Sequence, residues 1–99
     1  MSISRTDAPQ TDLARTVRFT NERLIIELTD GREIAVPLTW YPRLEHATPN
    51  ERANWELIGR GDGMHWPHLD EDVSVEGILA GRPSGESSAS FDRWLALRA

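Results

Sequence analysis

Three short runs of alternating apolar and polar residues lie within 16–36, and turn residues separate them. The runs cover 16–20, 23–28 and 32–36, and Asp30-Gly31 precedes the last of them. Alternation over runs of this length is typical of a strand that buries one face, and Asp-Gly is a common hairpin turn. The sequence therefore predicts three consecutive antiparallel strands whose shared face carries the core.

The register of the second hairpin follows from the side chains that would share a face. A two-residue loop would mix apolar and charged residues on both faces of the pair. A three-residue loop, with Gly31 in the left-handed conformation, sets Ile26 opposite Ile34 and Leu24 opposite Val36. This register also sets Leu28 opposite Arg32. We predict it because one face then carries the core.

The region after the third run contains signals for several short elements. In order, we expect a helical turn at 40–44, a helix at 49–54, strands at 55–58 and 64–66, and a last helix at 75–80. Both helix starts carry a capping residue, Thr48 before Pro49 and Ser74 before the last helix. The predicted fold is therefore α+β, with a small antiparallel sheet of about four or five short strands and two or three short helices.

The 99 residues allow one hydrophobic core. We expect a flexible arm at 1–14, a core domain at 15–81, a linker at 82–90 and a short amphipathic tail helix at 91–99, because the arm lacks periodicity and the linker is rich in Ser, Gly and Pro. The tail would align three apolar side chains at helical spacing, those of Phe91, Trp94 and Leu95. A helix this short does not persist alone in water, so it needs a surface in this chain or in another.

The composition excludes several classes of protein. The chain has no Cys, which excludes a disulfide framework, a thiol nucleophile and a Cys-based zinc site. All 11 basic residues are Arg, and 16 acidic residues leave a net charge of −5, which disfavours non-specific nucleic-acid binding. No apolar run is long enough for a membrane span or a signal peptide, so we expect a cytoplasmic protein.

The densest polar cluster lies in 62–76, a stretch with five carboxylates and no Arg. One interpretation is a divalent-metal site, with His65, His68, Asp70 and Asp72 as ligands. Pro67 stiffens the chain between the two histidines, however, and their spacing is not that of a known zinc site. We favour the other interpretation, a solvated acidic entry to the last helix, where carboxylates complement the helix dipole.

Catalytic motifs are weak. His65 with Asp70 or Asp72 could form a general acid–base pair, but no nucleophile or cofactor loop accompanies it. The glycines of 59–63 lack the helix start and the distal acidic residue of a phosphate-binding loop, and they indicate a hairpin. The sequence thus favours a protein without enzymatic activity and without a cofactor.

Three stretches resemble a bacterial family catalogued as domain of unknown function 2442: WYPRL at 40–44, ANW at 53–55 and GMHWPHLDEDVSVEGIL at 63–79. The resemblance spans about 15–81. It implies a small α+β fold with an antiparallel sheet, and an antitoxin-like role as partner of another small protein, with no enzyme activity or cofactor. The family often has an acidic residue where this chain has His68, which weakens the metal interpretation. Some related proteins carry a separate DNA-binding helical domain. We expect no such domain in this chain, and therefore no autonomous DNA binding.

We therefore expect a non-catalytic protein-interaction module that binds a protein partner through its acidic segment and its tail. The expected partner-binding residues are Asp70, Glu71, Asp72, Glu76, Phe91, Trp94 and Leu95. One alternative is a metal, ligand or enzymatic site at 65–72. The other is a DNA-binding regulator, for which the scattered Arg residues offer little support.

Overall fold

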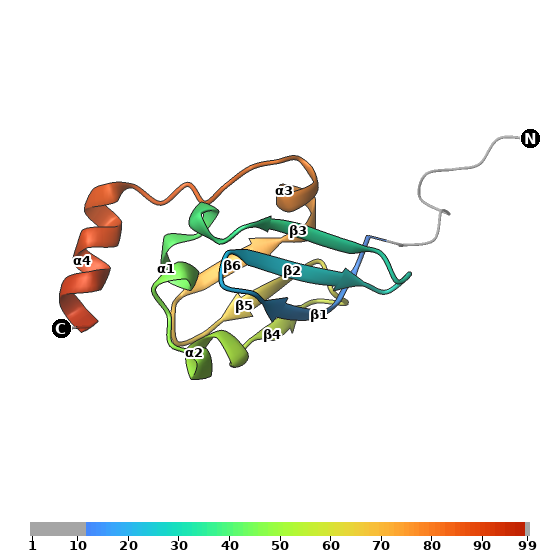
Figure 1. The fold of residues 1–99 in the computed structure, drawn as a ribbon, viewed down its shortest axis with the longest axis horizontal. Coiled ribbons are helices and arrows are strands. Elements are labelled where there is room, and N and C mark those ends of the chain that lie inside the picture. Colours follow the sequence, from blue (N-terminus) through green and yellow to red (C-terminus); the bar gives the residue numbers. More distant parts are fainter. Residues whose placement is uncertain (1–11, 99) are drawn as a thin grey trace, which may run out of the picture.

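The computed structural model describes residues 12–98, and most of the predicted arm lies outside them. The first sheet has the strand order β1-β2-β3 and is antiparallel, with β1 at Ala14–Phe19, β2 at Arg23–Leu28 and β3 at Glu33–Pro37 (Figure 1). These are the three strands predicted from the alternating runs. Because Ala14 is buried and already belongs to β1, the folded part begins slightly earlier than predicted.

The predicted hairpin register is confirmed. Ile26 pairs with Ile34 and Leu24 pairs with Val36. Gly31 has a φ of 95°, and the amide of Leu28 donates to the carbonyl of Arg32, 2.8 Å away, which closes the loop. The side chains of Leu24 and Ile26 are fully buried, so the register does place the apolar face of the sheet on the core.

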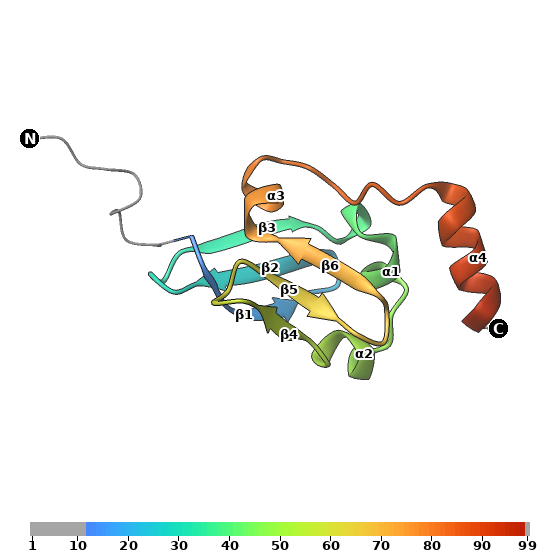
Figure 2. The same ribbon diagram turned by 180° about the vertical axis from the view of Figure 1, so that it is seen from behind.

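The remaining strands form a second antiparallel sheet with the order β4-β5-β6. Strand β4 is Glu56–Ile58, β5 is Gly63–Trp66 and β6 is Glu71–Ser74. Figure 2 shows this sheet packed face to face with the first one. The α+β class is confirmed, but the strands are divided between two sheets of three rather than joined in one.

Strand β6 corrects the expectation of a solvated acidic entry to the last helix. Its residues alternate between buried and exposed, so Glu71 and Val73 point inward while Asp72 and Ser74 point outward. Glu71 pairs with Trp66 and Val73 pairs with Met64, both on the inner face of β5. The alternation of apolar and polar residues that predicts a strand is absent at 71–74, because the inward position 71 holds a carboxylate.

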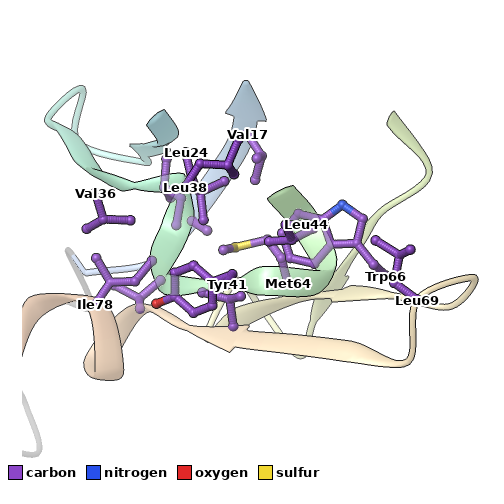
Figure 3. Packing of buried hydrophobic residues seen from close by; sticks show 14 of the residues in the cluster. Val17, Leu24, Val36, Leu38, Tyr41, Leu44, Met64, Trp66, Leu69 and Ile78 are labelled. Carbon is purple, nitrogen blue, oxygen red and sulfur yellow. The ribbon is translucent and has the colours of Figure 1, made fainter. Parts of the chain in front are cut away.

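The core lies between the two sheets. Figure 3 shows Leu24 and Val17 of the first sheet facing Met64 and Trp66 of the second. Trp66 is fully buried, and its indole Nε1–H donates to the backbone carbonyl of Arg52 at 3.0 Å. The large side chain therefore fills the core without leaving its polar atom unpaired.

Short helices close the ends of the two-sheet core. They are a 3₁₀ turn η2 at Leu38–Trp40, α1 at Pro42–Glu45, α2 at Pro49–Ala53 and α3 at Val75–Leu79. The predicted capping signals are confirmed, because Thr48 and Glu51 form a reciprocal capping box on α2 and Ser74 accepts from the amide of Gly77 on α3. No helix within the described residues is long and apolar enough to cross a membrane.

The C-terminal part of the chain returns along the core and ends in helix α4, Ser88–Arg98. We call residues 82–87 the strap. The predicted linker is not free of contacts, because the amide of Ser84 donates to the carbonyl of Trp40 and Glu86 forms an ion pair with Arg43. Helix α4 starts before the predicted boundary at 91, and it contributes no buried residue.

Candidate functional site

His65 and Asp72 lie opposite each other on the outer face of the second sheet. The Nδ1–H of His65 donates to Oδ1 of Asp72, and this hydrogen bond is the main cause that raises the pKa of His65. The Asp72 side chain is 67% exposed. The pair therefore lies on an open sheet face.

The other two proposed metal ligands lie elsewhere. The His68 ring lies 3.2 Å from the Asn54 amide nitrogen, and Asp70 lies in the β5–β6 turn with a φ of 51°. Between Asp12 and Arg98, no three His, Asp or Glu side chains gather in an arrangement that would hold a metal ion. Of the four residues in the metal interpretation, the structure joins only His65 and Asp72 by a hydrogen bond.

The proposed acidic surface has three exposed members, Asp70, Asp72 and Glu76. The Glu76 side chain is 91% exposed, and the Arg82 guanidinium lies 3.6 Å from its carboxylate. The fourth predicted member, Glu71, is wrong as a surface residue. It is only 9% exposed because β6 turns its side chain inward.

The tail residues are also placed differently from the prediction. The rings of Phe91 and Trp94 stack at 5.7 Å, and Phe91 meets the ring of His46 at 5.0 Å. Trp94 packs against the core, and the Arg98 guanidinium lies 4.4 Å from the centre of its ring. Phe91, Trp94 and Leu95 are all partly buried, so this stripe is not a free binding face.

A groove of about 400 Å³ brings the acidic segment and the tail together. It runs between the turn 67–70 and α4, and Asp70 lines it with Trp94, Arg93 and Leu97. Leu97 is 87% exposed, which makes it the most exposed large apolar side chain in the described part of the chain. Leu97 was not among the predicted partner-binding residues, because it lies outside the helical stripe that holds Phe91 and Trp94.

A second cavity, of about 230 Å³, lies beneath the strap. Glu71 and Tyr41 line it from the core side, and Ser84 and Arg82 line it from the strap. We call it the Glu71 cavity. Within residues 12–98, neither the Glu71 carboxyl nor the Tyr41 hydroxyl forms a hydrogen bond. Every fully enclosed polar side-chain atom in that range does have a hydrogen-bond partner, so these two groups are not fully enclosed. Both groups therefore keep some accessible surface, and both residues line the cavity.

The electrostatic setting of Glu71 is unusual. Burial is the main cause that raises its pKa to about 7, and the nearby Glu86 carboxylate adds to the rise. Arg43 opposes it but is engaged elsewhere: Nε and Nη2 donate to Glu86 at 2.6 to 3.0 Å, and Nη1 donates to the carbonyl of Leu69 at 2.8 Å. Glu71 thus lacks an ion-pair partner among the described residues.

Tyr41, Arg43 and Glu86 were not among the residues predicted for a site, although all three lie near Glu71. Arg43 and Glu86 lie 43 positions apart, and the acidic residue falls in a segment with the composition of a linker. One signal was available, since Glu71 and Val73 share the alternation of a strand. A strand predicted at 71–74 would have put the Glu71 side chain on the inner face with Val73.

Comparisons with known proteins agree on the fold. The family model described as "Protein of unknown function (DUF2442)" matches residues 14–84, which leaves α4 outside the match. A protein of unknown function from Rhodospirillum rubrum is 32% identical, with a TM-score of 0.62 over 78% of this chain and 93% of that one. An uncharacterised protein from Chromobacterium violaceum is 26% identical, with a TM-score of 0.63 over 87% of this chain and 75% of that one. No curated protein matches the chain.

Proposed function

The chain belongs to the DUF2442 family, and we propose that it is a non-catalytic interaction module that binds a basic protein partner. The groove between α4 and the turn 67–70 carries this proposal. It holds the carboxylate residue Asp70 next to Trp94 and the exposed Leu97. A partner segment with a positive charge beside an apolar side chain complements this lining.

Charge supports the choice of partner. The chain has a net charge of −5, and Asp72 and Glu76 continue the exposed negative charge beyond Asp70. Arg43 and Arg93 also line the groove, and Arg43 is paired with Glu86, so the partner is expected to place its own charge on the side of Asp70. Such a surface accelerates the encounter with a basic protein and weakens as salt screens it.

Helix α4 supplies the apolar part of the proposed surface. It has no buried residue, and the Arg98–Glu51 ion pair at 2.8 Å helps to hold it against the body. A helix attached in this way opens at a lower free energy than the core, so Phe91 and Leu95 become available when a partner displaces it. An antitoxin-like role, in which the module covers another small cytoplasmic protein, is one form of this proposal.

Catalytic, metal-binding and DNA-binding functions have less support. The His65–Asp72 pair lies on an open face. Within the described residues, five Arg side chains form ion pairs with carboxylates of the chain itself: Arg18, Arg32, Arg43, Arg82 and Arg98. The proposal therefore assigns no cofactor and no nucleic acid to the chain.

The proposal is tested by photo-cross-linking in the cells that make the protein. A benzoylphenylalanine residue replaces Leu97 in the groove, and the matched control carries it at Ala35, an exposed position on β3 far from the groove in sequence. We expect one recurrent product from position 97, with a partner of basic surface. The product should decrease when untagged wild-type protein competes, but not when the competitor is Asp70→Asn/Asp72→Asn. Equal products from both positions would contradict the proposal.

A further inference from the structure

We propose that the Glu71 cavity binds a primary alkylammonium group, presented by a lysine side chain of the partner. The source of the ammonium rests on the proposed function. The affinity of the cavity for an alkylammonium does not, because every group that would bind it belongs to this chain.

The Glu71 carboxylate has no partner among the described residues. Glu71 is 9% exposed and lines the cavity, and its carboxyl forms no hydrogen bond with the described residues. Burying a carboxylate is unfavourable unless a cation or hydrogen-bond donors meet it. A cation in the cavity would supply the partner that the fold does not.

Two Arg side chains of the chain near Glu71 have other carboxylate partners. The guanidinium of Arg43 donates to Glu86 and to the carbonyl of Leu69 through all three of its nitrogens. Arg82 lines the cavity, but its nearest described carboxylate is that of Glu76 at 3.6 Å. The negative charge of Glu71 therefore remains available to an external group.

The lining of the cavity favours an ammonium over a guanidinium. Three residues with acceptor atoms line the cavity from different walls: Glu71 from β6, Tyr41 from the segment before α1, and Ser84 from the strap. The Ser84 hydroxyl already accepts from the amide of Glu86 at 3.2 Å, so its second lone pair would meet the ammonium. Figure 3 shows the Tyr41 hydroxyl oxygen directed toward Ile78 of α3. A compact ammonium has three N–H donors that suit separate acceptors, whereas a planar guanidinium suits a single carboxylate face. The 230 Å³ also exceeds by several-fold the roughly 30 Å³ that one water occupies in the liquid.

Binding should depend on pH through Glu71. The charged groups that act on it are Arg43 of α1, Glu86 of the strap, and Asp70 and Asp72 beside it in the chain. Its pKa of about 7 means that the carboxylate is mostly ionised at pH 8 and mostly protonated at pH 6, whereas an alkylammonium keeps its charge at both. We expect the affinity to be about tenfold lower at pH 6 than at pH 8.

The test uses the full ¹⁵N-labelled chain and n-butylammonium chloride as probe, followed by amide chemical shifts. We expect saturable shifts at 71–74 and 82–85 at pH 8. The shifts should be lost in Glu71→Gln and kept in Glu45→Gln, which removes an exposed carboxylate away from the cavity. Tetramethylammonium chloride, which has no N–H donor, should cause no saturable shift. The unperturbed amides of each variant report that the fold is intact.

A second arm identifies the source of the ammonium with the peptide acetyl-Gly-Lys-Gly-amide. Shifts at the same amides from both n-butylammonium and the peptide would support the proposal in full. Shifts from n-butylammonium alone would assign the cavity to a free amine and overturn the partner lysine. No shifts, or shifts that survive Glu71→Gln, would overturn the site. Because neither arm contains the partner, the outcome is independent of the cross-linking result.

Discussion

Arg43 forms its ion pair with Glu86 of the strap. The two side chains are 15% and 9% exposed, and Nη2 of Arg43 lies 2.6 Å from the Glu86 carboxylate. This pair fastens the strap to α1 across 43 positions of sequence. It also leaves the Glu71 carboxylate at the cavity without a counter-charge, which links the docking of the strap to the chemistry of the cavity beneath it.

The first prediction concerns stability against pH. The native state keeps the Glu71 proton up to a pKa of about 7, while the unfolded chain releases it near 4.5. Between these values the native state binds more protons, so the free energy of unfolding falls as pH rises from about 4.5 to 7, by at most about 3 kcal/mol. Urea unfolding of Glu71→Gln should lack this decline and show higher stability than wild type at pH 8. Parallel pH profiles for the two proteins would refute the assignment.

The second prediction concerns the strap. Glu86→Gln leaves the largely buried Arg43 without its carboxylate and should lower the free energy of unfolding by about 1–3 kcal/mol. It should also lower the pKa of Glu71, since the Glu86 charge is the second cause that raises it. The control is Glu76→Gln, which removes an exposed carboxylate and should change stability by less than about 0.5 kcal/mol. Equal stability of the two variants would show that the Arg43–Glu86 pair does not hold the strap.

Local signals made part of the fold predictable. The register around Gly31 depends on adjacent residues and on one buried face, and the caps at Thr48 and Ser74 depend on residues three positions apart. Strand β6 and the strap depend on partners distant in sequence. A prediction from hydrophobicity therefore placed Glu71 on the surface, although it did identify 62–76 as the densest polar cluster of the chain.

The third prediction tests the hairpin. Gly31→Val should destabilise the protein by about 1 kcal/mol or more, because its φ of +95° is strained for a β-branched residue while no neighbouring atom blocks the side chain. Gly85→Val is the matched control, since a side chain there also meets no atom within 4 Å and the backbone is not in the positive-φ region. Thermal or urea unfolding measures both. If the two substitutions cost the same, positive φ is not the source of the effect.

The fourth prediction concerns the docking of α4. The Arg98 guanidinium is the main cause that holds the pKa of Glu51 at about 2, so the pair favours the docked helix above pH 4.5 and is lost as pH falls from there to about 2. At pH 7, Arg98→Gln should lower the ¹⁵N order parameters of α4 and leave those of the sheets unchanged. Arg93→Gln is the control on the same helix. An α4 that stays equally ordered in Arg98→Gln would place its docking on the aromatic contacts alone.

The most direct test of the interaction surface is the affinity of the cross-linked partner, measured by calorimetry at two salt concentrations. Two double variants reduce the net charge equally, Asp70→Asn/Asp72→Asn beside the groove and Glu22→Gln/Glu27→Gln in the β1–β2 turn and on β2. The account predicts that the first pair weakens binding by about tenfold or more and reduces its salt dependence, while the second pair leaves the affinity nearly unchanged. Equal losses from the two pairs would mean that only the net charge matters, and the groove would not be the binding surface.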